Sequence, residues 1–501
     1  MQQRRWILAA TILGSSMAFI DSTVINIALP VLQTDLGAGV DDVQWVVDSY
    51  LLVLSSLILA GGSLGDRLGR VRVFGAGVAL FALASLWCGA APSIGQLIAA
   101  RALQGAGAAL LVPGSLAIIA AAFPGNERGR AIGTWSALTA LAILAGPLLG
   151  GVLVQTISWR AVFFINLPIA AVVLWMVWRR VPAMAAVEAR GAIDWLGSVV
   201  VSIGLAGVTF ALIEAPVRGW RSASIVIAAT VGVAALASFV FVERRAKNPI
   251  VPLTLFRSRR FTGANVLTLL LYAALSGAMF LLPFELIQVR HFSPAEAGAA
   301  FLPFVGTMSL LSRFTGALAD RIGPRVPLIV GPVLAGCGFL LLALLANRPT
   351  YWSAFFPGIL TLGIGMAITV APLTTTVMTS IDDERHAGAA SGINNAVARV
   401  AGLLAIAIFG AMAIVVFGRE LERRLPPPLR APMLAQRTHL AAAQPPPGLP
   451  PPARADAARI VALAFGKAYR IDLIAGAVLA MASAAGAAMM GRQPRRDDQN
   501  Q

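Results

Sequence analysis

The chain has 501 residues, of which 58% are hydrophobic and only 12% are charged. This composition, with many apolar runs longer than about eighteen residues, excludes a soluble globular domain and indicates a polytopic membrane protein. A formal net charge of +16 would suggest a nucleic-acid partner for a soluble protein. Here most arginines lie between apolar runs, where they report membrane orientation, so we expect no nucleic-acid partner.

The apolar runs are long, unbroken and rich in Leu, Ala, Val and Gly, whereas a membrane barrel shows alternating segments of about ten residues. The sequence therefore predicts an all-α polytopic protein embedded in the lipid bilayer. Cys88 and Cys337 each lie inside an apolar run without a spaced partner, and the three histidines are scattered. These residues support neither a disulfide nor a metal site, and we expect no cofactor.

The predicted membrane spans number about fourteen and form three groups. They cover residues 6–30, 43–65, 73–91, 95–121, 131–154, 161–179, 194–214, 223–243, 261–287, 296–317, 327–346, 351–379, 388–416 and 471–490. The first six form an N-terminal bundle within residues 1–180, the next two are inserted within 181–260, and the last six form a C-terminal bundle within 261–501. We expect two related bundles joined by an inserted pair of helices.

Lys and Arg are concentrated in alternate segments between the spans, which predicts that both termini are cytoplasmic. The long outer segment at about 417–470 also contains arginines, but long loops escape the charge rule. It carries the proline tracts 426–428, 445–447 and 450–452. Such tracts favour an extended, poorly packed chain, so we expect a flexible external loop rather than a domain.

Two similar stretches stand between apolar runs in the two halves of the chain. Residues 62–72 read GSLGDRLGRVR, and residues 316–325 read GALADRIGPR. We expect each to be a short aqueous loop, and an ordinary positive-inside hairpin is the simpler interpretation. The first resembles the signature of the major facilitator superfamily, Gly-x-Leu-Ala-Asp-Arg-x-Gly-Arg-Lys, except that Val71 stands where a basic residue is usual. The resemblance implies a conformational gate, whose candidate residues are Gly62, Asp66, Arg67, Gly69, Arg70, Asp320 and Arg321.

The first span contains the most specific motif. Residues 20–30 read IDSTVINIALP, which resembles the Leu-Asp-x-Thr-Val-Val-Asn-Val-Ala-Leu-Pro signature of fourteen-helix drug:proton antiporters. A lone carboxylate at hydrocarbon depth costs about 2.5–3.5 kcal/mol or more, so Asp21 should be neutral, paired or facing water. A side chain that only bonds nearby backbone is the structural alternative. We take Asp21 as the strongest candidate for proton coupling.

The fourth span opens with RALQGAGAA at residues 101–109, which resembles the Arg-x-x-Gln-Gly-x-Gly motif of the same family. Arg101 and Gln104 can face one cavity, although an Arg near a helix end can also snorkel to the interface. On the predicted topology, Asp21, Asp48 and Arg101 lie within roughly 6 Å of one another in depth. We therefore expect a proton-sharing cluster. Asp48 is its least certain member, because the family pattern usually has no acid there.

The fifth span contains AGPLLGG at residues 145–151, which resembles the antiporter motif of exporters in this superfamily. Its candidate residues are Gly146, Pro147, Gly150 and Gly151. The resemblance favours efflux, whereas the structural alternative is a packing kink. Residues 158–168, 194–197 and 392–402 extend the resemblance over most of the chain.

The second half is poorer in intramembrane acids, so we expect proton chemistry to reside in the first half. Arg399 lies near the middle of a span, where it can attract an anionic group or bond backbone carbonyls of a neighbouring helix. Glu285 lies near an outer helix end. The candidate residues of the substrate cavity are Asn26, Gln104, Glu285 and Arg399.

The family resemblance implies an exporter of the cytoplasmic (inner) membrane that rocks two bundles about a midplane cavity. Its small-molecule substrates would be amphipathic drugs, dyes, biocides or antibiotics, exchanged for protons. Two rival functions remain, namely export of an anionic natural product or lipid, and a membrane-embedded sensor or enzyme. The sequence does not determine whether a periplasmic adaptor protein takes part.

Overall fold

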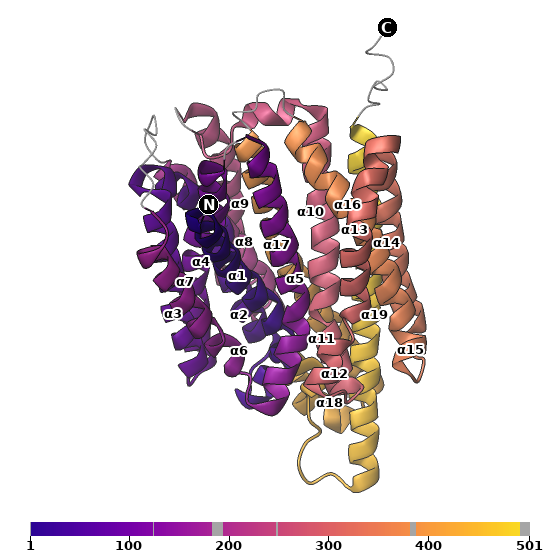
Figure 1. Cartoon of the computed structure of the whole chain (residues 1–501). Helices are drawn as coiled ribbons and strands as arrows, with labels where there is room; N and C mark the ends of the chain where they lie inside the picture. Colours follow the sequence, from indigo (N-terminus) through magenta and orange to yellow (C-terminus); the bar gives the residue numbers. More distant parts are fainter. Residues whose placement is uncertain (1, 124, 183–193, 247–248, 381–386, 491–501) are drawn as a thin grey trace. The chain divides into compact units, whose positions relative to one another are not determined.

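A computed structural model describes residues 2–123, 125–182, 194–246, 249–380 and 387–490. Every regular element in this part of the chain is helical (Figure 1). Among the described residues, fourteen helical segments are long and apolar enough to cross a membrane. The predicted all-α fold with fourteen spans is therefore confirmed.

The helices comprise long membrane-crossing elements and the short segments that join them. Their bounds are α1 (Gln2–Asp35), α2 (Val40–Leu68), α3 (Arg70–Ala90), α4 (Ile94–Ala122), α5 (Gly125–Thr156), α6 (Ala161–Phe164), α7 (Asn166–Arg179), α8 (Trp195–Arg218), α9 (Ala223–Arg245), η1 (Leu253–Arg257), α10 (Arg259–Phe280), α11 (Leu282–Phe284), η2 (Glu285–Val289), α12 (Pro294–Ala299), α13 (Leu302–Ile322), α14 (Arg325–Leu345), α15 (Tyr351–Ala354), α16 (Phe356–Thr379), α17 (Ala387–Arg424), α18 (Pro427–Leu434), η4 (Arg437–Ala442) and α19 (Pro451–Met489).

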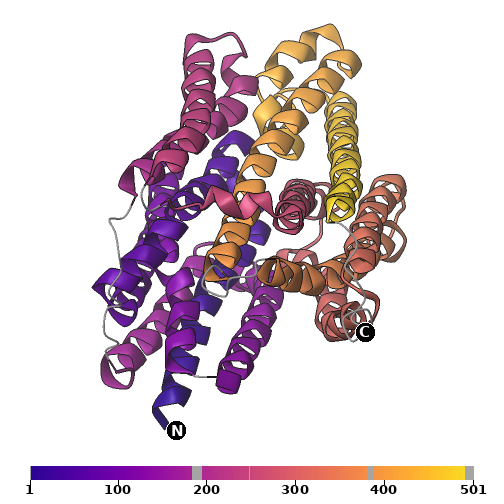
Figure 2. The same cartoon turned by 90° about the horizontal axis from the view of Figure 1, so that it is seen from above.

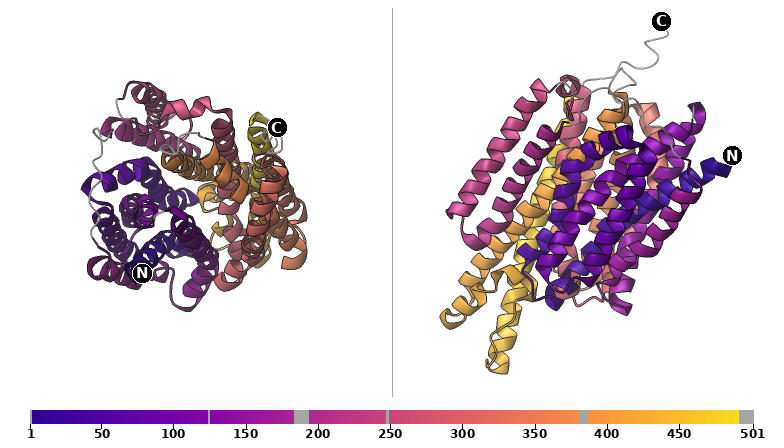
Figure 3. Two further views of the ribbon diagram at one scale, coloured as in Figure 1. Left: turned by 45° about the horizontal axis from the view of Figure 1, so that its top comes forward. Right: turned by 90° about the vertical axis from the view of Figure 1, so that its left-hand side faces the viewer.

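The chain forms two compact units. Unit 1 comprises Met1–Ile250, Met279–Ala299 and Ile406–Tyr469. Unit 2 comprises Val251–Ala278, Ala300–Ala405 and Arg470–Gln501. In unit 1, α1 packs against α5 and α4, and α2 packs against α4 and α8 (Figure 2). Helices α8 and α9 run side by side as an antiparallel pair (Figure 3). In unit 2, α16 packs against both α13 and α14.

Close packing of α2 on α4 depends on small residues. A Cβ atom added at Gly61 would lie 2.1 Å from the carbonyl oxygen of Ala109, and one at Gly105 would lie 2.5 Å from that of Tyr50. Such distances leave no room for a side chain, so the two backbones meet directly. This contact fixes the height of the fourth span relative to the second, and it positions the polar groups described below.

The expected aqueous loop at residues 62–72 is wrong, because helix α2 continues through Leu68 and α3 begins at Arg70. Gly69 alone breaks the helix, with a φ of 98° that only glycine adopts without strain. The second copy of the motif behaves similarly, since Gly323 has a φ of 83° directly after α13. Each motif thus turns the chain within one or two residues.

Residues 419–424 were expected to be helical and belong to α17, which ends at Arg424, but the expected loop up to about residue 470 is wrong because α19 begins at Pro451. Phe417, Leu421 and Leu425 recur every four residues and are buried, which is the pattern of a packed helix face. The prolines misled the sequence interpretation because Pro451 stands in the first turn of α19, where proline is tolerated. Glu420 on α17 bonds Lys467 on α19, and these two helix ends lie side by side (Figure 3).

Candidate functional site

A buried ion pair joins α1 to α4 within unit 1. The Nη1 atom of Arg101 donates a hydrogen bond of 2.6 Å to Oδ2 of Asp21, and both side chains are only 1% exposed. The Arg101 Nε atom donates to the carbonyl oxygen of Val46 on α2 at 3.1 Å. Arg101 therefore does not snorkel to the interface, and Asp21 does not merely bond nearby backbone. The pairing expected between these two residues is present.

Amide side chains complete the hydrogen bonds of Asp21. Its Oδ1 atom accepts from Nε2 of Gln104 at 2.8 Å and from Nδ2 of Asn166 at 3.0 Å. The same two nitrogens donate to Oγ of Ser85, at 2.8 Å and 3.2 Å. The carboxyl group thus accepts three hydrogen bonds, one of them charge-assisted from a guanidinium. Four helices, α1, α3, α4 and α7, thus contribute to one polar network.

Aromatic rings surround the guanidinium of Arg101. Its central carbon lies 4.4 Å from the ring centroid of Tyr50 and 5.9 Å from that of Phe163. Both rings are almost fully buried. Cation–π contact partly replaces the hydration that the charge loses, and the apolar surroundings strengthen its attraction to Asp21.

Ser85 and Asn166 are not among the site residues predicted from the sequence. Asn166 belongs to the stretch 158–168, whose family resemblance was noted but not assigned a role, so a signal for it was present. Ser85 lies in an apolar run without a distinguishing motif. Only its position on α3, opposite Gln104 and Asn166, reveals that it joins the network.

Asp48 lies outside this network. Its side chain is fully buried, and both carboxylate oxygens lack a hydrogen-bond partner among the described residues. The reason lies in helix geometry, because Asp48 follows Gln44 by one turn and shares its face of α2. Gln44 donates to the carbonyl oxygen of Ile406 on α17 at 2.7 Å, whereas Val46 and Tyr50 face Arg101. The expected cluster of two carboxylates with one guanidinium does not form by direct bonds.

Of the four residues expected in a substrate cavity, Gln104 bonds Asp21, and the other three form different contacts. Among the described residues, the side chain of Asn26 bonds the carbonyl oxygen of Ser22 on its own helix at 3.5 Å. Glu285 is buried and forms an ion pair of 3.0 Å with Arg290. Arg399 belongs to unit 2, where it interacts electrostatically with Tyr272. Of the four, only Gln104 contacts Asp21.

The glycines of the predicted antiporter motif pack α5 directly beside the ion pair. A Cβ atom at Gly146 would lie 1.8 Å from Oγ1 of Thr23, and one at Gly150 would lie 2.9 Å from the carbonyl oxygen of Val24. Pro147 lies inside α5, and Gly151 would meet the carbonyl oxygen of Pro294 on α12. The motif therefore brings α5 against the segment of α1 that follows Asp21.

The predicted gate residues occupy the junction of α2 and α3. Nε of Arg70 donates to Oδ1 of Asp66 at 2.7 Å, and Nη1 of Arg70 donates to the carbonyl oxygen of Ala117 on α4 at 3.2 Å. In the second copy, Asp320 lies near the end of α13, and Arg321 is exposed. The interpretation of this motif as a gate also predicts that Arg70 or Arg72 pairs with Asp382, Asp383 or Glu384, and these three acids lie outside the described residues.

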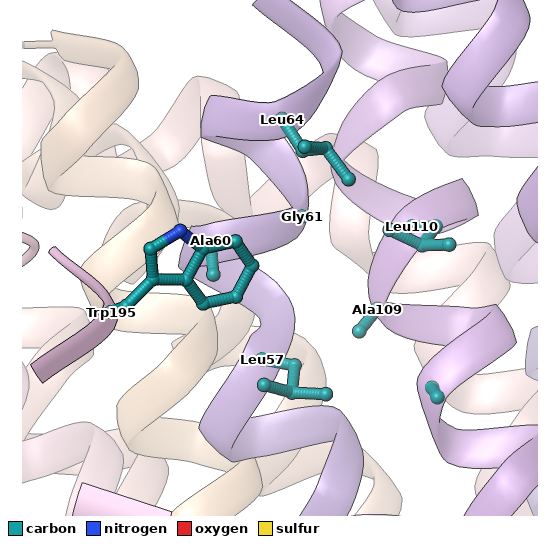
Figure 4. Close-up of a pocket in the computed structure, with 8 residues that line it drawn as sticks. Leu57, Ala60, Gly61, Leu64, Ala109, Leu110 and Trp195 are labelled. Carbon is teal, nitrogen blue, oxygen red and sulfur yellow. The ribbon is translucent and has the colours of Figure 1, made fainter. Parts of the chain in front are cut away.

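A small apolar pocket opens between α2 and α4 (Figure 4). Its volume is about 130 Å³, and it is lined by Leu57, Ala60, Gly61, Leu64, Ala106, Ala109, Leu110 and Trp195. Sites for drug-sized ligands usually enclose about 300–1,000 Å³. This pocket is too small for such a ligand and is lined by none of the polar network, so it is not the substrate site.

Comparisons with known proteins agree with the motifs described above. Residues 11–406 match the family model of the Major Facilitator Superfamily. The chain is 36% identical over 434 residues to the multidrug resistance protein Stp of Mycobacterium tuberculosis, covering 86% of this chain and 80% of that protein. It is 34% identical over 417 residues to the tetracenomycin C resistance and export protein of Streptomyces glaucescens, covering 82% and 76%.

Solved structures support the fold. A bacterial homolog of the human lysosomal transporter Spinster superposes with a TM-score of 0.69 at 16% identity, covering 98% of this chain and 99% of that chain. The nucleoside transporter NupG superposes with a TM-score of 0.63 at 10% identity, covering 97% and 99%. At such low identities the likeness concerns the fold alone.

We expect Asp66→Asn to lower the transport rate by up to about fivefold while expression stays normal. The substitution removes the charge that holds Arg70, and a surface ion pair of this kind contributes about 0.2–1 kcal/mol to the state that contains it. Initial rates of dye efflux, with the amount of protein quantified, measure the effect. Glu127→Gln is the matched control, because it breaks the exposed pair with Arg4 elsewhere in unit 1. Equal transport rates for both variants and the wild type would contradict a role of Asp66 in the gate.

Proposed function

Because the chain belongs to the Major Facilitator Superfamily, we propose that it exports amphipathic drugs, dyes, biocides or antibiotics in exchange for protons. It is a transporter and not an enzyme, and its relatives are named as multidrug and antibiotic resistance or export proteins. The observation that carries the proposal of proton coupling is the buried contact between Asp21 and Arg101.

We infer the coupling between proton binding and conformation from the two protonation states that Asp21 can adopt. In the described state it accepts three hydrogen bonds, from Arg101, Gln104 and Asn166. A proton on this carboxyl group would cancel its charge and weaken the pull on the guanidinium, leaving a buried charge without its partner. Protonation therefore disfavours this arrangement of α1 and α4 and favours one in which Arg101 finds water or another anion. Exchange of a proton at Asp21 thereby biases the conformation of the transporter.

The proposed location is the cytoplasmic membrane, with both termini cytoplasmic. The fourteen candidate spans support a multi-pass arrangement, and the distribution of Lys and Arg between them supports the orientation. In this arrangement, bundles within residues 1–180 and 261–501 alternate access to the two sides of the membrane. Protons enter the cell as the substrate leaves it.

An anionic natural product or lipid is the second candidate substrate. Arg399 lies well inside α17, and a charge within a membrane helix commonly marks a substrate or ion pathway. The two candidates differ in the charge of the transported molecule, so matched cationic and anionic dyes distinguish them.

Expression in an efflux-deficient host tests the proposal with ethidium as the cationic probe. We expect cells that carry the transporter to accumulate less ethidium than vector controls, and we expect a protonophore to abolish the difference. Inverted vesicles provide the direct measurement, since an imposed pH gradient alone should drive ethidium uptake. An ethidium difference that survives the protonophore in the absence of any proton gradient would contradict proton coupling. Uptake of carboxyfluorescein but not ethidium would favour the anionic substrate.

A further inference from the structure

A second carboxyl group lies deep inside the helices of unit 2. Asp472 belongs to α19 and is 0% exposed, and neither of its carboxylate oxygens has a hydrogen-bond partner among the described residues. Its place is easily missed in the sequence, where it stands directly after a charged, proline-rich segment. Because α19 begins at Pro451 rather than near residue 471, Asp472 lies near the middle of this 39-residue helix, where its charged first half gives way to its apolar second half.

The surroundings of Asp472 are apolar and closely packed. One turn further along α19, a Cβ atom at Gly476 would lie 2.9 Å from Cβ of Ala278 on α10 and 3.8 Å from the ring of Phe339 on α14. At Gly336, on α14, a Cβ atom would lie 3.0 Å from the carbonyl oxygen of Ala477. The three helices therefore touch next to Asp472.

Asp472 has no bonded counter-charge in the described part of the chain. The nearest titratable groups along the three helices are Tyr272 on α10, Cys337 on α14, and Lys467, Tyr469 and Arg470 on α19. Arg399 on α17 interacts with Tyr272. Among the described residues, none of them forms a hydrogen bond or ion pair with Asp472. An ionised carboxylate without partners is strongly disfavoured in such a place, so the carboxyl group is neutral in this state and carries a proton.

The contrast with Asp21 defines the role. Asp21 lies in unit 1 and accepts three hydrogen bonds, one of them from a guanidinium, whereas Asp472 lies in unit 2 and accepts none from the described residues. A buried acid that stayed neutral in every state would serve no better than an apolar residue of similar size. We propose that Asp472 is a second proton-binding site, which releases its proton when another conformation admits water to α19.

This inference rests on the proposed proton-coupled export and adds a second proton to each cycle. Each coupled proton multiplies the greatest attainable substrate gradient by about ten for every unit of imposed pH gradient. Losing one proton should therefore reduce the steady-state gradient by about tenfold per pH unit, even where the transport rate changes little. A change in the greatest attainable substrate gradient identifies a proton-binding site. A residue that only supports packing would change the transport rate but not this limit.

The test uses the full chain reconstituted in liposomes, with ethidium as the probe and no membrane potential. At an imposed gradient of one pH unit, we expect Asp472→Asn to lower the steady-state ethidium gradient about tenfold relative to the wild type. Asp456→Asn is the matched control, because Asp456 lies on the same helix but is exposed, and it should change nothing. An Asp472→Asn variant with the wild-type gradient would overturn the inference while leaving proton-driven export intact. A wild type that does not respond to the pH gradient would instead contradict the proposed function.

A second measurement does not depend on transport. Infrared difference spectra of the purified protein in lipid nanodiscs report the carbonyl stretch of buried protonated carboxyl groups. We expect the wild type to lose one such band reversibly as the pH is raised or as ethidium is added, and we expect Asp472→Asn to lack that band from the start. A band that belongs to Asp472 and persists under all these conditions would identify a permanently neutral structural acid and overturn the inference.

Discussion

Asp21→Asn is expected to abolish proton-driven efflux and to lower the free energy of unfolding by about 3–5 kcal/mol. The amide cannot ionise, so it leaves the guanidinium of Arg101 buried without a counter-charge. Proton-driven transport should fall to the level of protein-free vesicles, because an asparagine at this position can neither bind nor release a proton. Ethidium uptake driven by a pH gradient in inverted vesicles measures the first effect, and thermal unfolding in detergent measures the second.

A double variant separates the two effects of this substitution. Asp21→Asn combined with Arg101→Gln removes both charges, so most of the lost stability should return while proton-driven transport stays absent. Asp35→Asn is the control on the same helix, because Asp35 is half-exposed and pairs with Arg160 at 3.3 Å. Efflux at the wild-type rate in Asp21→Asn, with full sensitivity to a protonophore, would assign the coupling proton to another residue. Asp48 would be the next to test, because it is buried without a hydrogen-bond partner among the described residues.

Arg101→Lys is expected to lower the transport rate by at least about fivefold although the positive charge remains. A lysine ammonium is a point charge, and it cannot bond Asp21 and Gln104 while also donating to Val46 as the guanidinium does. The buried acceptor left unsatisfied costs about 1–3 kcal/mol, which corresponds to a change of roughly 5-fold to 150-fold. Initial rates of ethidium transport, measured over a range of pH, should show both the loss and a shift in the pH profile.

Arg160→Lys provides the matched comparison for this prediction. Arg160 also pairs with an aspartate and lies 4.2 Å from the centroid of Trp159, but its side chain is 33% exposed. Water can replace its lost hydrogen bonds, so the same change of residue should have little effect on transport. If the two lysine variants behaved alike, the planar shape of the Arg101 side chain would have no special importance.

The motifs predicted Asp21, Arg101 and Gln104, but not Ser85 or Asn166, which complete the network. Asp21 and Arg101 are conspicuous because a charge in an apolar run is rare, and their similar depth follows from counting residues along helices. Depth alone could not separate Asp48 from this pair, because the face of α2 that bears Asp48 is set by how α2 rotates against its neighbours. Ser85 carries no charge and stands in no motif, so only tertiary packing reveals its bond to Gln104.

Element boundaries were less predictable than the number of spans. Apolar length sets where a chain can cross a membrane, but it does not show where a helix continues into polar sequence. The helix α19 extends through Arg454, Asp456 and Arg459 before it reaches its apolar part, which hid the depth of Asp472. At residues 62–72, three glycines suggested a loop, yet only Gly69 has a positive φ.

The one-residue junction at Gly69 also has a mechanical meaning. Consecutive Cα atoms are about 3.8 Å apart, so the end of α2 and the start of α3 cannot separate by more than a few ångströms in any conformation. In the described conformation, the bond between Arg70 and Asp66 also joins the two ends across the glycine. A tilt of α2 is therefore transmitted to α3 without slack, and spin labels on either side of Gly69 would report one constant distance throughout the transport cycle.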